Sequence, residues 1–200
     1  MMEHSPGRDA AIRALLPIAA RQGWNWRSLR LALRAAGEDP ALAESLFPTG
    51  PLGAIAAWAD LADRDMAAAI AAEGLPARTP QRIRRLIELR LAALAPHKAA
   101  LRRAMSLLAL PWNAPKALPI TARTVDAMWH AAGDTAADFA WYTKRASLAA
   151  IYGATLAFWL RDDAPGLDAA LAFLDRRLAD LGRIGKLRRR LQPARAASRA

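Results

Sequence analysis

The chain has 200 residues, of which 54% are hydrophobic and 24% are charged, so it can bury a sizeable core and is not a mainly disordered protein. Its formal net charge is +11, but seven basic residues with no acid among them lie between positions 183 and 200. The basicity is therefore mainly a property of the tail, and it does not by itself indicate a nucleic-acid-binding protein. The absence of cysteine excludes disulfides, thiol nucleophiles and thiolate metal sites.

Alanine and leucine dominate the apolar residues, which favours helices over strands. Apolar spacing, glycines and prolines predict helices at 9–22, 28–36, 40–46, 51–72, 79–95, 96–110 and 121–132. Two more are expected, one from the loop 133–137 to residue 161 and one from Pro165-Gly166 to residue 181. We therefore expect an all-α bundle of about nine or ten helices. Prolines 111, 115 and 119 are predicted to mark a seam between a front half and a back half.

Three short helices followed by a long one resemble the layout of the TetR-like fold, whose first helices include a helix-turn-helix. We expect an N-terminal helical region (1–76) with that motif, a C-terminal helical region (77–182) and a basic tail (183–200), all within one structural unit. The reading helix, 40–46, holds Glu44 and no base, and the stretch 35–63 holds five acids and no Lys or Arg. Because DNA contacts need basic and amide side chains there, the motif is predicted to be degenerate and not to bind specific DNA.

Residues for catalysis or metal binding do not assemble into a pattern. The three histidines are far apart and lack metal-ligand spacing, and no nucleophile elbow is present. The paired carboxylates fall at predicted helix ends, where capping is the common explanation: Asp134/Asp138 and Asp162/Asp163. We therefore expect no enzymatic activity, no catalytic residue and no metal site.

The segment 126–162 carries the most informative pattern. Trp141 and Tyr142 precede Lys144 and Arg145 at the entrance of a helix. Aromatic residues beside charges are typical of interface hot spots, which favours a protein contact. The alternative is that Trp141 packs inward and Tyr142 is an ordinary boundary residue, and the pattern alone leaves both readings open.

Farther along this helix, one wide face is apolar at helical spacing, formed by Leu148, Ile151, Tyr152, Thr155, Leu156 and Trp159. This face is predicted to pack in the core, against a second copy of the chain, or around an apolar ligand such as a lipid. After it, the tail combines basic residues with a thin apolar stripe. Its candidate membrane-contact residues are Arg183, Lys186, Leu187, Arg188, Arg189 and Arg190, the alternative being an unstructured basic tail.

A resemblance to a known family rests on three strings, DAMWHAAGD (126–134), DFAWYTKRASLAAIYGAT (138–155) and RDDAPGLDAALAFLDRRLAD (161–180). Weaker matches are LALPWNAPKAL (108–118) and IELRLAALAP (87–96). These residues resemble the lipid-binding accessory proteins of coenzyme Q (ubiquinone) biosynthesis, ninth in the yeast coenzyme Q series. The chain begins almost directly at its first predicted helix, without the transit peptide of eukaryotic members, as a bacterial member would.

The resemblance implies a TetR-like homodimer without specific DNA binding, a bound isoprenoid lipid or quinone precursor and no other cofactor. It implies docking to the quinone-ring hydroxylase of the pathway through Asp126, Met128, Asp138, Trp141, Tyr142 and Arg145. The implied location is the bacterial cytoplasm, peripherally at the inner membrane, whose anionic surface is a possible partner. The competing expectations are a TetR-type transcriptional regulator with an apolar effector pocket, and a lipid carrier without a protein partner.

Overall fold

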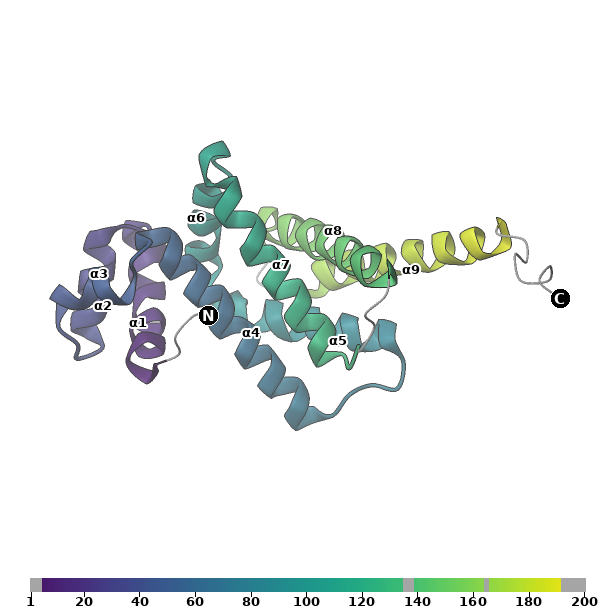
Figure 1. The fold of residues 1–200 in the computed structure, drawn as a ribbon, viewed down its shortest axis with the longest axis horizontal. Helices are drawn as coiled ribbons and strands as arrows, with labels where there is room; N and C mark the ends of the chain where they lie inside the picture. Colours follow the sequence, from purple (N-terminus) through teal and green to yellow (C-terminus); the bar gives the residue numbers. More distant parts are fainter. Residues whose placement is uncertain (1–4, 135–138, 164–165, 192–200) are drawn as a thin grey trace. The chain divides into compact units, whose positions relative to one another are not determined.

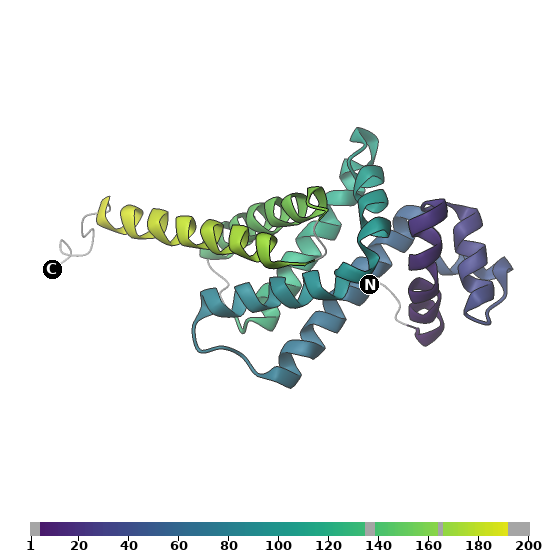
Figure 2. The same ribbon diagram turned by 180° about the vertical axis from the view of Figure 1, so that it is seen from behind.

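The computed structural model describes residues 5–134, 139–163 and 166–191, with the backbone alone at 139–140 and 184–191. These residues form helices and short 3-10 turns without a strand, which confirms the all-α prediction (Figures 1 and 2). The chain divides into two compact units, Met1–Ala149 and Ala150–Ala200, and the division falls inside one helix, α8. Each unit is described by itself.

The first unit begins with short helices and continues with a set of longer ones. Its elements are α1 (Pro6–Gln22), α2 (Trp26–Ala35), η1 (Pro40–Leu42), α3 (Ala43–Leu46), α4 (Gly50–Glu73), α5 (Thr79–Leu94), η2 (Ala95–His97), α6 (Lys98–Leu108), η3 (Pro111–Asn113) and α7 (Ala114–Ala131). Helix α8 (Phe139–Arg161) crosses the division, and α9 (Asp168–Leu191) follows. In the first unit α1 packs on α2 and α6, and α4 packs on α5 and α7.

Two predicted helix boundaries were wrong. Helix α7 begins at Ala114, seven residues before the predicted start, and runs through Pro119. Pro115 stands in its first turn, where a backbone N–H has no helical partner and its loss costs little. The prolines therefore do not form a seam between two halves. The last helix continues to Leu191 instead of ending at residue 181, so the beginning of the basic tail has a helical backbone.

Aromatic and ionic contacts join the short helices to α4. The rings of Trp24 and Trp58 stack with centroids 5.5 Å apart, and the Trp24 indole N–H donates to the Ala100 carbonyl at 3.0 Å. The Arg64 guanidinium of α4 binds the Asp9 carboxylate of α1 through two hydrogen bonds of 2.7 and 2.9 Å. The buried side chains of α1 and α2, including Ile12 and Leu33, complete this corner of the core.

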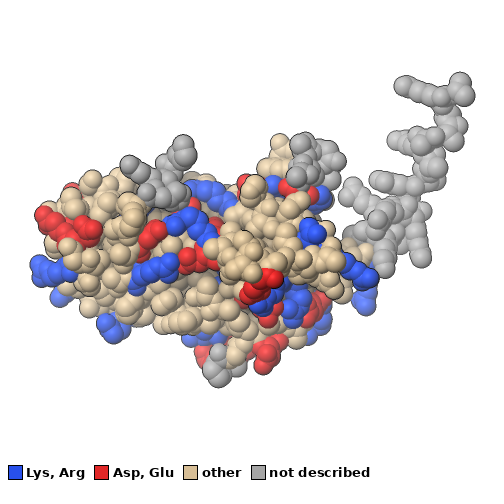
Figure 3. All heavy atoms as spheres, turned by 90° about the horizontal axis from the view of Figure 1, so that it is seen from below, with Lys and Arg blue, Asp and Glu red and all other residues tan. Residues whose placement is uncertain are grey.

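The segment predicted as the second helix of the helix-turn-helix forms the 3-10 turn η1 followed by the short helix α3. Helix α3 has only four residues, and its Glu44 accepts a hydrogen bond from Arg30 of α2 at 3.1 Å. Acidic and basic side chains lie side by side on the face drawn in Figure 3, so no surface of a single sign dominates that face. None of the described helices is long and apolar enough to cross a membrane.

Candidate functional site

The C-terminal end of α7 is held in place by a glycine turn and by an arginine of α5. Gly133 has a backbone φ of +77°, which residues with a Cβ rarely adopt. Its N–H donates to the His130 carbonyl at 2.9 Å. Arg82 of α5 donates to the Ala132 carbonyl at 2.9 Å and to the Pro76 carbonyl at 2.7 Å. The chain is thereby fixed at Asp134, the last residue described before α8.

Two ion pairs join this end of α7 to the start of α8. Arg145 Nη2 lies 2.6 Å from Asp126 Oδ1, and Lys144 Nζ lies 2.7 Å from Asp134 Oδ1. The side chains of Arg145 and Asp134 are 15% and 12% exposed, whereas that of Asp126 is 58% exposed, so the cluster reaches from the interior to the surface. Arg145 Nη1 and Asp134 Oδ2 are buried, 3.9 Å apart, and without a hydrogen-bond partner in the described part of the chain. The cluster is thus less completely satisfied than most buried polar groups, a feature that favours a functional role.

Aromatic rings cover these charges. The Arg145 guanidinium lies 3.8 Å from the centroid of the Trp141 ring, and the Trp141 and Tyr142 rings meet edge to face at 4.7 Å. Lys144 Nζ lies 5.6 Å from the Trp129 ring centroid. Cations over aromatic faces restrain both partners. The result is a surface, called here the α7–α8 patch, made of Asp126, Asp134, Trp141, Tyr142, Lys144 and Arg145.

Four of the six residues predicted for partner binding lie together in this patch: Asp126, Trp141, Tyr142 and Arg145. Tyr142 is 68% exposed, while Met128 is fully buried and offers no surface to a partner. Asp138 lies outside the described residues. Asp134 and Lys144 were not among the predicted binding residues. Lys144 stands between the predicted residues Tyr142 and Arg145, but its pairing with Asp134, ten positions away, is visible only in the structure.

The apolar face predicted on α8 is buried at every position: Leu148, Ile151, Tyr152, Thr155, Leu156 and Trp159. The Thr155 hydroxyl donates to the Ile151 carbonyl at 2.8 Å, which lets this polar residue lie among apolar ones. Phe158 of α8 stacks on Phe173 of α9 with centroids 4.7 Å apart. Among the predicted membrane-contact residues, the Arg183 side chain is exposed. The side chains of Lys186, Leu187, Arg188, Arg189 and Arg190 lie outside the described residues.

An open groove between α4 and α7, which the sequence did not predict, borders the patch. Its volume is about 590 Å³, within the range of small-molecule sites, and its wall is mostly apolar, with Ala67, Ile70, Ala71, Leu75, Ala127 and Ala131. Charged and polar residues of both signs also line it, namely Asp60, Asp63, Arg64, Arg123, Asp126 and His130. Asp126 belongs both to the groove and to the α7–α8 patch. A molecule in the groove would therefore lie next to a protein docked on the patch.

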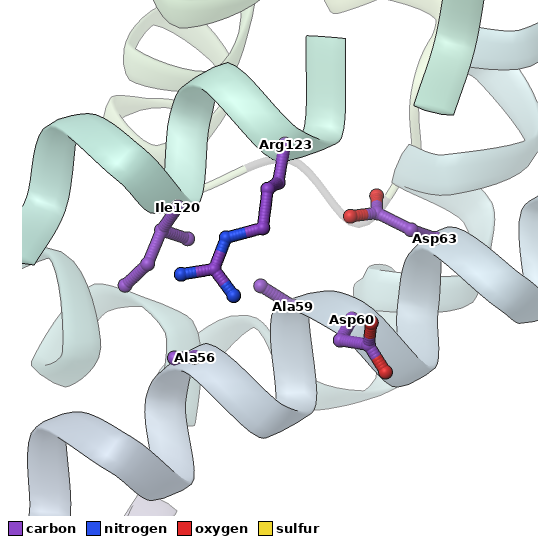
Figure 4. A pocket seen from close by; sticks show the side chains of 6 residues that line it. All are labelled: Ala56, Ala59, Asp60, Asp63, Ile120 and Arg123. Carbon is purple, nitrogen blue, oxygen red and sulfur yellow. The ribbon is translucent and has the colours of Figure 1, made fainter. Parts of the chain in front are cut away.

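A buried ionic cluster joins α4, α5 and α7 next to this groove. Arg90 of α5 donates to Asp63 of α4, and the Thr124 hydroxyl of α7 donates to the other Asp63 oxygen at 3.0 Å. Burial raises the pKa of Asp63 to about 6, and the nearby Arg90 opposes that rise. Figure 4 shows Arg123 reaching from α7 over Ala59 of α4, with Asp60 and Asp63 on the same helix. The hollow that these residues line has room for about one water molecule, about 10 Å³, so it is a packing gap.

Among the described residues, no group of three or more histidine, aspartate or glutamate side chains is placed to hold a metal ion. The chemistry that the arrangement offers is recognition: an exposed aromatic-ionic patch and an apolar groove that share one carboxylate.

The similarity of this chain to known proteins includes the same region. Residues 114–185, which include α7 and α8, match the COQ9 family. The chain is 42% identical over 108 residues to the human protein named "Ubiquinone biosynthesis protein COQ9, mitochondrial", an alignment that covers 54% of this chain and 34% of the human one. It is 29% identical over 176 residues to the Drosophila melanogaster protein of that name, with 86% of this chain and 54% of the relative covered. The fission yeast protein is 32% identical over 149 residues, with 74% and 59% covered. The chain thus spans about a third of the human relative's length and more than half of the other two.

A solved structure shares the fold. The crystal structure titled as the TetR transcriptional regulator from Nitrosomonas europaea superposes with a TM-score of 0.68 at 26% sequence identity, covering 89% of this chain and 99% of that one. The predicted TetR-like architecture is thereby confirmed. Over residues 114–185, the chain is similar to the COQ9 family.

Proposed function

We propose that this protein is a non-catalytic accessory protein of ubiquinone biosynthesis, which holds an isoprenoid quinone precursor and presents it to a ring hydroxylase. The names of its relatives support the pathway. The observation that carries the rest is the position of Asp126, which borders the apolar α4–α7 groove and pairs with Arg145 in the α7–α8 patch. A ligand and a protein partner would meet at this residue.

The physical reason for such a protein is the insolubility of its ligand. Each methylene of a polyprenyl tail that leaves water gains about 0.8 kcal/mol, so the precursor stays in a bilayer unless another apolar surface receives it. The groove offers such a surface beside Arg123 and His130, which are suited to the oxygen atoms of a quinone ring. The buried α8 face from Leu148 to Trp159 remains the other candidate for lipid contact. It would contact a lipid if the helices packed on it opened, or if two chains enclosed the lipid in a dimer.

A homodimer through α8 and α9 belongs to the proposal. Opposite its buried face, α8 exposes small residues, Gly153, Ala154 and Ala157, which allow close approach of another helix. Native mass spectrometry of the purified protein would report the dimer mass and any co-purified isoprenoid in one measurement, and a ligand-free monomer would contradict both expectations.

Docking is tested by changing the patch. Trp141→Ala and Tyr142→Ala should each abolish binding to the pathway's hydroxylase and fail to restore quinone synthesis in cells that lack the protein. Leu42→Ala is the matched control, because Leu42 is 41% exposed and lies far along the chain in η1. Helicity measured by circular dichroism should be unchanged in all three. If both patch variants bind the hydroxylase and restore synthesis, the docking assignment is wrong.

Contact of the tail with an anionic membrane also belongs to the proposal. Its support is the helical backbone through Leu191 together with the basic sequence from Arg183 onward. Attraction to anionic lipid amounts to about 1 kcal/mol per basic residue near the surface. Deletion of residues 183–200 should weaken liposome binding. Unchanged binding would contradict membrane contact by the tail, but not the other parts of the proposal.

A transcriptional regulator is the second candidate, because the structural neighbour carries that title. Two features oppose it. Helix α3 has four residues, and the stretch 35–63 has no Lys or Arg to contact phosphates. A gel-shift assay against genomic DNA at moderate salt, with the basic tail deleted, should give no specific shift. A specific shift would favour the regulator.

A further inference from the structure

The turn between α6 and α7 exposes large apolar side chains. Trp112 in η3 is 73% exposed and Leu118 in the first turns of α7 is 71% exposed, the two highest values among the large apolar residues that the structure describes. Met105, near the end of α6, is also exposed. The junction of the two helices stands at the edge of the first unit in both ribbon views (Figures 1 and 2). Such a grouping marks a surface that contacts something other than water.

The turn is rigid, so these side chains cannot simply fold inward. The buried Asn113 donates its side-chain N–H to the Leu107 carbonyl at 2.8 Å, and its backbone N–H donates to the Leu110 carbonyl at 2.8 Å. Prolines before and after it restrict the backbone further. Trp112 is therefore presented outward by the structure of the turn.

In the segment of chain that contains the turn, every charged residue is basic. From 89 to 125 the chain has no Asp or Glu, but it has Lys98, Arg102, Arg103, Lys116 and Arg123 in addition to the buried Arg90. Arg103 donates to the Ala20 carbonyl of α1 at 3.0 Å and so helps to fasten α6. Arg102 and Lys116 are exposed on the two sides of the turn. An exposed tryptophan among cations, without acids, is complementary to the headgroup region of an anionic bilayer.

We propose that the α6–α7 turn is a membrane-contact surface, on which Trp112 and Leu118 enter the interface of an anionic bilayer and Arg102 and Lys116 face the lipid phosphates. This surface is separate from the basic tail, and its contact with lipid does not depend on the proposed quinone function.

The turn is placed usefully with respect to the groove and the patch. Trp112 in η3 directly precedes α7, and Asp126 lies in the last third of that helix, about 18 Å along it from Ala114 at a rise of 1.5 Å per residue. The groove residues of α7 run from Arg123 to Ala131, on the patch side of the turn. If the proposed function holds, membrane contact at the turn brings the bilayer to the same compact unit that carries the groove.

Tryptophan fluorescence of the full chain provides the test, because the tail 183–200 has no tryptophan and cannot give the signal. Vesicles of phosphatidylcholine and phosphatidylglycerol with brominated acyl chains should quench the emission by roughly one-seventh, since one tryptophan of seven enters the bilayer. Trp112→Phe should remove this quenching, and Trp141→Phe, the matched control, should retain it. Quenching that persists in Trp112→Phe would overturn the proposal.

Charge is tested by vesicle sedimentation. Arg102→Gln and Lys116→Gln should each lower the partition coefficient onto anionic vesicles on the order of five-fold, because each removes one cation near the surface. Arg78→Gln, an exposed arginine before α5, is the control and should leave it unchanged. Hydroxylase binding should be equal in all three variants. A failure of the membrane-contact proposal can then be told apart from a failure of the docking proposal. Partition of Arg102→Gln and Lys116→Gln equal to that of the unchanged chain would contradict the surface, as would a loss of partner binding without a loss of vesicle binding.

Discussion

Arg145 of α8 donates through Nε to Asp126 of α7 at 2.8 Å, although the two residues lie 19 positions apart in the sequence. The same guanidinium lies over the Trp141 ring, so a single side chain sets the position of a carboxylate and of an aromatic ring. Planarity is what allows both contacts, because the edge of a guanidinium donates hydrogen bonds while its face stacks.

Replacement of Arg145 by lysine should therefore be damaging despite the retained charge. Lysine provides a point charge without a planar face, so we expect Trp141 to lose its restraint and hydroxylase binding to fall by about ten-fold or more, near the energy of a hot-spot contact. The measurement is titration calorimetry with the hydroxylase. Lys144→Arg is the matched control, because Lys144 contacts Asp134 as a point charge. Equal affinities for Arg145→Lys and the unchanged chain would show that stacking is not needed.

Tyr142 should separate binding from stability. Because its side chain is 68% exposed, Tyr142→Ala is expected to change the free energy of unfolding by less than about 0.5 kcal/mol, which is typical of surface positions. Loss of an interface aromatic costs about 2 kcal/mol or more of binding, close to a thirty-fold change in Kd. Denaturant unfolding and affinity measured on the same preparation test the two effects together. A large loss of stability would assign Tyr142 to the fold.

A larger side chain in the groove should displace its ligand. Ala127 lines the groove, so Ala127→Phe is expected to remove co-purified isoprenoid from the native mass spectrum while hydroxylase binding is retained. Ala122→Phe is the control, because Ala122 is exposed on α7 and is absent from the groove wall. If Ala127→Phe retains its lipid, the ligand lies elsewhere, and the α8 face becomes the stronger candidate.

The buried Asp63 should make stability depend on pH in a defined direction. Its pKa is about 6 in the folded chain against 3.8 ordinarily, because burial disfavours the charged form. Protonation therefore stabilises the fold fully below the unfolded value, and this stabilisation is lost as the pH rises through about 6. Its upper limit is about 3 kcal/mol, since two pKa units correspond to roughly that energy.

Asp63→Asn removes this titration and gives the test. The difference in unfolding free energy between the unchanged chain and the variant should decrease as the pH is raised from 4.5 to 7.5, measured by denaturant unfolding at constant ionic strength. An increase over that range would mean that Arg90 and Thr124 hold the pKa of Asp63 below its ordinary value. Asp65→Asn is the control, because Asp65 is a surface partner of Arg13 and is 42% exposed.

Residue type and local spacing by themselves determined the helical class, most helix bounds and the apolar face of α8. Ala and Leu favour helix, glycines end it, and a period of 3.6 residues shows which side chains share a face. Every predicted lipid-contact residue from Leu148 to Trp159 is accordingly buried on α8. The predicted start of α7 at residue 121 was wrong because the prolines before it were read as breaks, whereas Pro115 lies in the first turn, where it is tolerated, and Pro119 lies inside the helix.

Only the tertiary structure decided which helix lies opposite each face. Asp126 meets Arg145, and Asp63 meets Arg90 and Thr124, across separations of 19, 27 and 61 positions. Met128 was predicted to contact a partner but is buried in the core. The α4–α7 groove exists because small residues face each other from two distant segments. Helical periodicity is a local property of the chain, whereas the packing partner of a face is set by the whole arrangement of helices. For that reason the sequence could point to the patch, but only the fold could join it to the groove.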